Sequence, residues 1–187
     1  MNLTLFDLDH TLLTGDTDAL WCQFLMNEGV LPRQQFEARN ADIVARYKAG
    51  TVGLQEFADF YVGTLAGRTP AAWEPLRQQF LAEQIAPRIG QAAFDLVNQH
   101  LDAGDLVVLT TATNRFLTEL TAQHLGIEHL IATDVQQAQG QLTGATEGTL
   151  NMRDGKAVRL HAWLQGRGHG LADFDSTAYS DSINDLP

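Results

Sequence analysis

Two aspartates separated by one residue stand at the end of the first apolar segment of this chain. Residues 3–8 are apolar apart from their acids, which is typical of a buried strand, and the sequence FDLDHT places Asp7, Asp9 and Thr11 where that strand ends. Asp and Thr also favour the start of loops, so this cluster alone is compatible with ordinary turn chemistry. At a sheet edge, however, neighbouring carboxylates can act as acid, base, nucleophile or cation ligand.

Three more polar clusters lie far from this one in the sequence. The second follows the apolar run LVVL, the third is a lysine in RDGKAVRL, and the fourth lies in DSINDLP. Each has an ordinary explanation, because helix N-caps favour hydroxyl and amide side chains and a single lysine is usually solvated. Four such clusters in this order nevertheless indicate one shared site. Their members are Thr111, Ala112, Thr113 and Asn114, then Lys156, then Asp181, Ser182, Asn184 and Asp185.

The segments that must position these clusters alternate between strand and helix after Pro87. Alternating strands and helices predict right-handed βαβ units and a parallel sheet. Such sheets bind ligands beyond the carboxyl ends of their strands, so we expect all four clusters at one rim. The predicted fold class is therefore α/β, with a Rossmann-like parallel sheet flanked by helices. We predict strands at 106–109 and 129–132, helices at 91–103, 115–125 and 155–165, and a hairpin or loop over 134–150.

The pattern between the first strand and this alternating part is helical only. Thr69 reads as an N-cap before Pro70, and Pro75 predicts a delayed start or a kink in that helix. A block of helices inserted after the first strand predicts a cap domain. We expect a core domain made of residues 1–15 and 86–187 and an all-helical cap domain made of residues 16–85.

The composition excludes several classes of protein. The 187 residues include 12 Lys+Arg and 23 Asp+Glu, a net charge of −11, and such a chain repels nucleic acid. Cys22 is the only cysteine, which excludes an intrachain disulfide and a Cys-cluster zinc site. No apolar run approaches about 18 residues, and the first residues lack the basic region of a signal peptide, so we expect no membrane partner and a cytoplasmic location.

Together the four clusters resemble the motifs of the haloacid dehalogenase superfamily and, within it, of the phosphoserine-phosphatase-like hydrolases of subfamily IB. FDLDHT resembles the first motif, VVLTTAT the second, Lys156 the third and DSINDLP the fourth. The helical block lies where that family carries its C1-type cap, so the resemblance covers essentially the whole chain. It implies a Mg²⁺-dependent phosphomonoesterase that acts through an aspartyl-phosphate on a small phosphorylated metabolite.

A cation is needed if a carboxylate is to attack an anionic phosphate ester in so acidic a chain. Mg²⁺ prefers oxygen ligands and retains some waters. Asp7 and Asp181 can supply carboxylates and the main-chain carbonyl of Asp9 a third oxygen, which is also the set that the resemblance implies. Asp185 would then hold a metal-bound water or Lys156.

The same resemblance implies a role for each remaining motif residue. Asp7 would be the nucleophile, and Lys156 would add a fixed positive charge beside it. Asp9 would be the general acid for the leaving alcohol and then the base for water, which requires a raised pKa. The phosphoryl group would be bound by Thr111 and the amides that follow it, with Thr11, Ala112, Asn114 and Asn184 as further substrate contacts.

Cap residues are expected to choose the substrate. Asp16 lies nine residues after Asp7, about where phosphoserine phosphatases carry a Glu that recognises the substrate amine. Arg46 would pair a carboxylate or be a surface charge, and Asp18 is a further candidate contact. The expected substrate is an amine-bearing phosphate such as phosphoserine, histidinol phosphate or phosphoethanolamine, and the expected assembly is a monomer or homodimer.

Two other functions fit part of this pattern. A 2-haloacid dehalogenase of the same fold uses an Asp nucleophile but has no use for the second acid at Asp9. A receiver-like phosphoacceptor module also groups acids, a Thr and a Lys around Mg²⁺, but it lacks a helical insertion after the first strand. No GxGxxG follows that strand, which argues against a dinucleotide site. Because the chain stops at Pro187, just after the fourth motif, we expect the working enzyme to continue beyond it.

Overall fold

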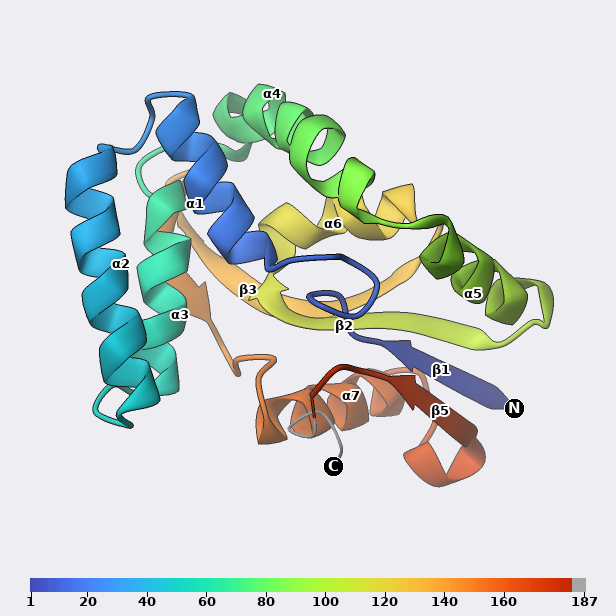
Figure 1. The fold of residues 1–187 in the computed structure, drawn as a ribbon. Helices are drawn as coiled ribbons and strands as arrows, with labels where there is room; N and C mark the ends of the chain where they lie inside the picture. Colours follow the sequence, from blue (N-terminus) through green and yellow to red (C-terminus); the bar gives the residue numbers. More distant parts are fainter. Residues whose placement is uncertain (183–187) are drawn as a thin grey trace.

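A five-stranded sheet forms the centre of the computed structural model, which describes residues 1–182 (Figure 1). The strand order is β4-β3-β2-β1-β5. β1 pairs in parallel with β2 and β5, and β2 pairs in parallel with β3, as an α/β fold requires, whereas β4 is antiparallel to β3. The strands are β1 (Asn2–Phe6), β2 (Leu106–Asn114), β3 (His129–Ala138), β4 (Gln141–Glu147) and β5 (Asp175–Tyr179).

Helices α5 and α6 lie on one face of the sheet and α7 lies on the other, while α1 to α4 lie between β1 and α5 in the sequence (Figure 1). None of the helices within residues 1–182 is long and apolar enough to cross a membrane. The helices are α1 (Thr17–Asn27), α2 (Arg33–Lys48), α3 (Leu54–Val62), α4 (Pro70–Phe80), α5 (Gln91–Asp102), α6 (Arg115–His124) and α7 (Asp154–Gln165). Short helical turns occupy Gly63–Leu65, Leu81–Ile85, Ala86–Arg88 and Leu171–Asp173.

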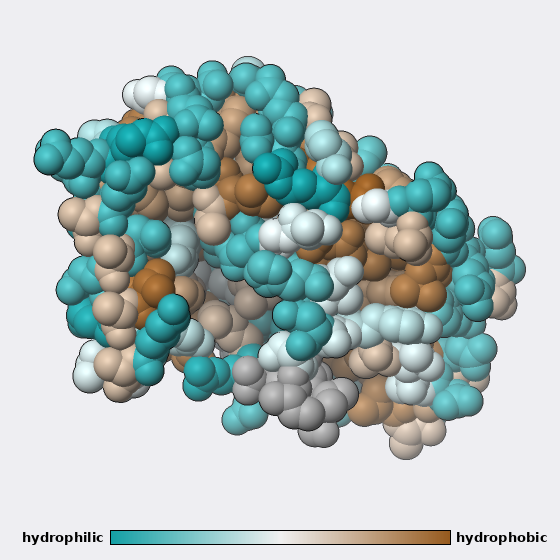
Figure 2. Space-filling view, in the orientation of Figure 1, coloured by the Kyte–Doolittle hydropathy of each residue, from teal (hydrophilic) through white to brown (hydrophobic). Residues whose placement is uncertain are grey.

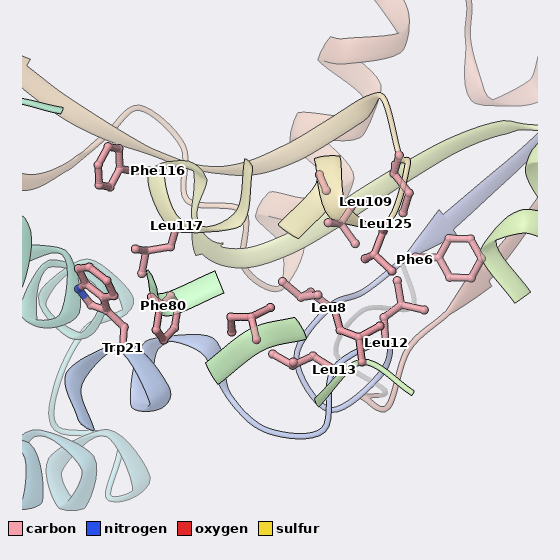
Figure 3. Close-up of a cluster of buried hydrophobic side chains, with 14 of the residues drawn as sticks. Phe6, Leu8, Leu12, Leu13, Trp21, Phe80, Leu109, Phe116, Leu117 and Leu125 are labelled. Atoms are coloured by element: carbon pink, nitrogen blue, oxygen red, sulfur yellow. The ribbon is translucent and has the colours of Figure 1, made fainter. Parts of the chain in front are cut away.

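The larger buried cluster joins the inserted helices to the sheet. Trp21 of α1 lies with its ring centroid 5.7 Å from Phe24 and 5.0 Å from Phe80 of α4. The same cluster contains Phe6 of β1 and Leu109 of β2 (Figure 3). Full burial of such side chains contributes roughly 1.5–3 kcal/mol each. Helices α1 and α4 are therefore fixed against the core and hold the chain that follows β1 in place.

A second buried cluster fixes α7 beneath the opposite face. Leu160 and Leu164 of α7 pack with Leu3, Val108 and Ile131 from three neighbouring strands. Val108 belongs to this cluster and the next residue, Leu109, to the other, because successive side chains of a strand point to opposite faces. Burial on both faces explains why the sequence of β2 begins as an uninterrupted apolar run. Packing of α7 also determines where Lys156, in its first turn, can reach.

The segment predicted as a hairpin or loop forms a hairpin. β3 extends to Ala138, and the chain turns at Gln139 and Gly140 into β4. Both turn residues have positive φ, 52° and 78°, as two-residue hairpin turns matched to strand twist require. The hairpin reaches the inserted helices, since Thr146 of β4 donates its main-chain N–H to Asp59 of α3 at 2.8 Å.

Of the two effects predicted for Pro75, a delayed start or a kink, the delayed start does not occur. Helix α4 begins at Pro70, with the Thr69 hydroxyl accepting from the Ala72 N–H at 3.1 Å, and runs through Pro75 to Phe80. Trp73 is almost fully buried in this helix, and its indole N–H donates to the Leu65 carbonyl at 3.0 Å. The N-cap and this buried tryptophan stabilise the helix enough to offset the hydrogen bond that Pro75 cannot make.

Candidate active site

A pocket of about 260 Å³ opens beyond the carboxyl ends of the strands and beside helices α1, α2 and α3. The space-filling view shows a hollow between these helices and the core (Figure 2). Aromatic residues line it from the inserted helices, Tyr47 from α2 and Phe57 and Tyr61 from α3. Of the residues predicted from the sequence, it brings together Asp7, Asp9, Asp16, Asp18, Ala112, Asn114, Lys156 and Asp181.

Asp7 stands directly after β1, and both of its carboxylate oxygens have hydrogen-bond donors. Its main-chain N–H donates to the Tyr179 carbonyl at 2.9 Å, which continues the pairing of β1 with β5. Lys156 donates to Oδ1 at 2.7 Å and the Thr11 hydroxyl donates to Oδ2 at 3.2 Å. Asp7 and Lys156 are each 8% exposed, so this ion pair is held in a mostly desolvated place. The two contacts thereby fix the carboxylate at the pocket wall.

Thr11 also links Asp7 to the far end of the chain. The main-chain N–H of Asp181, just past β5, donates to the Thr11 hydroxyl at 3.0 Å. One hydroxyl therefore contacts the residues that follow β1 and β5, and Asp7 and Asp181 line the same pocket. Thr11 does not line that pocket itself, so its contacts are those of a residue that positions others. The predicted residues Asn184 and Asp185 lie outside the described residues.

Asp9 lies two residues after Asp7 in a different environment. It accepts hydrogen bonds from the Thr17 N–H at 2.7 Å, from the Thr17 hydroxyl, and from the Thr113 hydroxyl at 2.8 Å. Burial, helped by the negative charge of Asp16, raises the pKa of Asp9 to about 6, although the three hydrogen bonds oppose that shift. A carboxyl group with this pKa can both donate and accept a proton near neutral pH.

Two more acids stand on the side of the pocket formed by α1. Asp16 is the N-cap of α1, where its carboxylate accepts from the Ala19 N–H at 2.8 Å. Burial raises the pKa of Asp18 well above its ordinary value, and the charges of Asp16 and Asp9 act in the same direction. The ring of Tyr47 stacks on that of Phe57 at 4.2 Å. This side of the pocket therefore combines acids with aromatic faces, which is the chemistry that attracts an organic cation.

The second predicted cluster is divided between pocket and interior. Thr111 is fully buried, does not line the pocket, and accepts the Thr113 N–H on its hydroxyl at 3.2 Å. Asn114 caps α6 through the Leu117 N–H at 3.1 Å, as its type predicts, and also lines the pocket together with Ala112. At the end of β2, therefore, Ala112, Thr113 and Asn114 line the cavity, and Thr111 does not.

Asn151 is a buried residue that the sequence did not single out. Its amide nitrogen donates to the carbonyls of Thr111 and Ile131 at 2.9 and 3.0 Å and to the Thr110 hydroxyl at 3.0 Å. These bonds hold β2 and β3 together where their register shifts between Thr111 and Asn114. Asn151 therefore shapes the end of β2, where Ala112 and Asn114 line the pocket. No pattern in the loop around Asn151 predicts this role.

The structure gives Arg46 the surface role of the two predicted for it and brings to the pocket Arg153, which the sequence did not single out. Arg46 does not line the pocket and instead forms ion pairs with Asp42 at 3.6 Å and Glu56 at 2.9 Å. Arg153, three residues before Lys156, does line it. The only signal that could have found Arg153 is its place next to the third motif, because its proximity to α2 depends on how the inserted helices fold.

The oxygen donors expected for a divalent cation lie in this pocket. Within residues 1–182 no three His, Cys, Asp or Glu side chains are grouped so that they could hold a metal by themselves. The expected set needs only two carboxylates, from Asp7 and Asp181, together with a main-chain oxygen of Asp9. Asp7 and Asp181 both line the cavity, and Thr11 links the Asp7 carboxylate to the Asp181 main-chain N–H. Hard oxygen donors in this number suit Mg²⁺, which keeps several waters.

This chain is similar to known hydrolases and phosphatases. The model of the haloacid dehalogenase-like hydrolase family matches residues 4–187. A histidinol-phosphatase of Neisseria meningitidis serogroup C is 35% identical over 188 residues, which cover 100% of this chain and 85% of the relative. A phosphoserine phosphatase of Mycobacterium tuberculosis is 30% identical over 190 residues. The match covers 97% of this chain and 59% of that relative.

Solved structures agree with the fold. A crystal structure of a protein with unknown function from Bordetella pertussis Tohama I matches with a TM-score of 0.95 and 43% identity, over 100% of this chain and 84% of that one. A substrate-bound phosphoserine phosphatase matches with a TM-score of 0.65 and 19% identity, over 99% of this chain and 80% of that one. At that identity the second match shows a shared fold.

Proposed function

Because this chain belongs to the haloacid dehalogenase-like hydrolase family and is a phosphoric monoester hydrolase, we propose that it hydrolyses a small phosphomonoester through a phosphorylated Asp7. One observation carries this proposal. The carboxylate of Asp7, held by Lys156 at 2.7 Å, shares a pocket with Asp9, whose pKa is raised to about 6. A fixed nucleophile and a poised acid are the two groups that this reaction needs.

In the first step an oxygen of Asp7 attacks phosphorus and the bond from phosphorus to the ester oxygen breaks. Asp9 gives its proton to the departing oxygen, which leaves as an alcohol. With a pKa of about 6, the acid form of Asp9 is present in roughly one molecule in ten at pH 7, and its share rises as the pH falls. Lys156 stabilises the negative charge that builds between Asp7 and the phosphoryl group.

In the second step Asp9, now ionised, takes a proton from water, and the water oxygen attacks phosphorus. The bond between Asp7 and phosphorus breaks, so inorganic phosphate leaves and the Asp7 carboxylate is restored. Thr17 and Thr113 keep Asp9 oriented through both steps by their hydrogen bonds. A dehalogenase has no comparable use for a second acid with this pKa, which favours phosphate ester hydrolysis.

Binding of the phosphoryl group is assigned to the end of β2, where α6 begins, and to the last motif. Ala112 and Asn114 line the pocket there, and main-chain amides at this helix N-terminus can donate to phosphoryl oxygens. Thr111 contributes by shaping the end of β2 through its bond to the Thr113 N–H. Asn184 is proposed as one further donor.

Mg²⁺ is proposed as the cofactor, held by the carboxylates of Asp7 and Asp181 and by the main-chain oxygen of Asp9, with Asp185 supporting that shell. When bound, it would neutralise charge on the phosphoryl group and on the attacking carboxylate. Thr11 keeps two of these donors together by contacting the Asp7 carboxylate and the Asp181 main chain.

For the substrate we propose an amine-bearing phosphate, with histidinol phosphate ahead of phosphoserine. Asp16 offers negative charge to a substrate cation, the neighbouring Asp18 can accept a hydrogen bond from it, and Tyr47 and Phe57 offer stacked ring faces in the same pocket. A planar imidazole uses both features, whereas the small side chain of serine uses only the charge. The relative named histidinol-phosphatase, matched over 85% of its length, supports the same choice.

The test is a phosphate-release assay with L-histidinol phosphate, O-phospho-L-serine and p-nitrophenyl phosphate, each with Mg²⁺ and with EDTA. We expect turnover of all three with Mg²⁺, the highest kcat/KM for L-histidinol phosphate, and loss of turnover in EDTA. Turnover that survives EDTA would contradict the cofactor proposal. A higher kcat/KM for phosphoserine would contradict the substrate proposal and leave the reaction class intact.

A further inference from the structure

Arg153 is a charged residue of the pocket that the proposed reaction leaves without a role. It precedes α7 as its N-cap residue, three positions before Lys156, and lines the same cavity as Asp7. Its guanidinium crosses to the inserted helices, where Nη2 donates to the Tyr47 hydroxyl at 3.0 Å. The Arg153 Cζ also lies 5.7 Å from the centre of the Tyr47 ring.

The charge balance of the pocket distinguishes Arg153 from Lys156. Lys156 is engaged with the Asp7 carboxylate at 2.7 Å. Arg153 has no carboxylate partner within residues 1–182, and its contacts there are with the neutral phenol of Tyr47. Five acids line the same pocket, so a substrate dianion that enters it needs cationic groups. Among the described residues, Arg153 offers a positive charge not already matched by an acid.

The orientation of the guanidinium suits an anion. Tyr47 takes one N–H of Nη2, and within the described residues neither Nη1 nor Nε of Arg153 has a hydrogen-bond acceptor. These nitrogens form a planar fork that matches two oxygens of a phosphoryl group. Tyr47 therefore orients the Arg153 guanidinium without neutralising its positive charge.

The backbone conformation of Arg153 also indicates a functional role for its side chain. Its φ is 49° and its ψ is −129°, a conformation that residues with a side chain rarely adopt and that glycine adopts freely. An arginine in a position that suits glycine indicates that its side chain is needed there, because backbone strain persists mainly where function uses it.

We propose that Arg153 is a substrate-binding residue, whose guanidinium binds the phosphoryl oxygens while Tyr47 positions it. The inference rests on the proposed function, since it takes a phosphomonoester as the ligand. It extends the phosphate site from the end of β2 to the loop before α7, on the side of the pocket that touches α2. A substrate carboxylate is the competing ligand, and the experiment separates the two.

The probe is inorganic phosphate, measured by isothermal titration calorimetry with Mg²⁺, and p-nitrophenyl phosphate, which has no carboxylate. We expect R153M to weaken phosphate binding about 10- to 100-fold, as loss of a charge-assisted pair does, and to raise KM for p-nitrophenyl phosphate by a similar factor. R153K should recover part of the loss, and Y47F should lose a few-fold. R167M is the matched control, because Arg167 stacks on Trp163 at 3.6 Å and does not line the pocket.

R153G guards against a folding artefact, since glycine accepts the local backbone and should fold at least as stably as R153M. Unchanged phosphate affinity and unchanged KM for p-nitrophenyl phosphate in R153M and R153G would overturn the inference. An effect confined to phosphoserine would overturn it too, because the ligand would then be a carboxylate. Phosphate binding by the wild type without any turnover would contradict the proposed function alone.

Discussion

The two sides of the pocket treat their acids differently. On the core side, Asp7 is paired with Lys156 and stays an anion beside a cation. On the side of α1, burial and the charge of Asp16 raise the pKa of Asp9, and burial with the charges of Asp16 and Asp9 raises the pKa of Asp18, with hydroxyls and aromatic rings as neighbours. The core side is therefore built to handle phosphate, and the α1 side to hold a proton or a substrate cation. A substrate that carries both charges fits this pocket better than one that carries phosphate alone.

The largest expected effect comes from breaking the core side at Asp7. D7N keeps the size of the side chain and removes the nucleophile, so kcat should fall by at least about 10⁴-fold on every phosphate ester. Steady-state phosphate release with p-nitrophenyl phosphate measures this loss, and circular dichroism checks the fold. Substantial turnover by a clean D7N preparation would remove Asp7 from the role of nucleophile.

The next effect, at Asp9, depends on the leaving group. D9N cannot donate a proton, so kcat on an alkyl phosphate such as L-histidinol phosphate should fall about 10²- to 10⁴-fold. The loss on p-nitrophenyl phosphate should be smaller, because nitrophenolate leaves without a proton. Equal losses on the two substrates would show that Asp9 is not the acid.

A smaller effect is expected from D16N, which changes the α1 side and keeps its helix cap, since Asn caps as well as Asp. Asp16 raises the pKa of Asp9 from its side of the pocket, so D16N should lower that pKa below about 6. The fall in kcat on L-histidinol phosphate as pH rises should then begin at a lower pH than in the wild type. The kcat/KM for that substrate should drop about tenfold if a charge contact is lost, with little change for p-nitrophenyl phosphate.

An identical pH profile of kcat in D16N and wild type would show that Asp16 does not raise the pKa of Asp9. A loss of kcat/KM equal for both substrates would mean that Asp16 does not recognise the substrate cation. Each result would remove one of the two functional roles, tuning of Asp9 or binding of the substrate cation, from the α1 side of the pocket.

The smallest expected effect concerns Asp134, a second acid that is paired with cations, as Asp7 is paired with Lys156. Asp134 of β3 is flanked by Arg115 at 2.6 Å and Arg159 at 2.5 Å. Burial would raise the pKa of Asp134, but the two arginines outweigh it, so that pKa is lowered. Because the folded state has the lower pKa, Asp134 stabilises the fold above pH 3.8, and that contribution is lost as pH falls through the lowered value.

Urea unfolding of D134N and wild type at pH 6 and pH 3 measures this contribution. After discounting for the exposure of these side chains, we expect a difference of less than about 1 kcal/mol at pH 6 that narrows at pH 3. A difference that widens on acidification would show that Asp134 does not act as a paired carboxylate in the core.

The sequence predicted the core side of the pocket better than the cap side. Asp7, Asp9 and Lys156 follow elements whose type is readable from apolar periodicity, and parallel strands end at one rim, so their convergence could be predicted. The fold class was confirmed, and so was the hairpin after residue 134. The helical cap boundaries at residues 16–85 stay a prediction.

The residues that the sequence missed depend on how helices rotate and approach. Arg46 lies on the face of α2 that meets Glu56, whereas Tyr47, one residue later and on the apolar face that periodicity predicts for this helix, lines the pocket. Arg153 and Asn151 stand in a loop whose polar composition is typical of any surface turn. Their contacts, across 106 and 40 residues of sequence, exist only once the chain has folded.

Trapping the phosphorylated enzyme tests the central claim most directly. The chain is mixed with L-histidinol phosphate and Mg²⁺, quenched in acid, and treated with borohydride, which reduces an aspartyl-phosphate to homoserine. We predict that peptide mass spectrometry finds this conversion at position 7 in the wild type and nowhere in D7N. Rapid turnover with conversion at another residue, or with none at Asp7, would contradict the account.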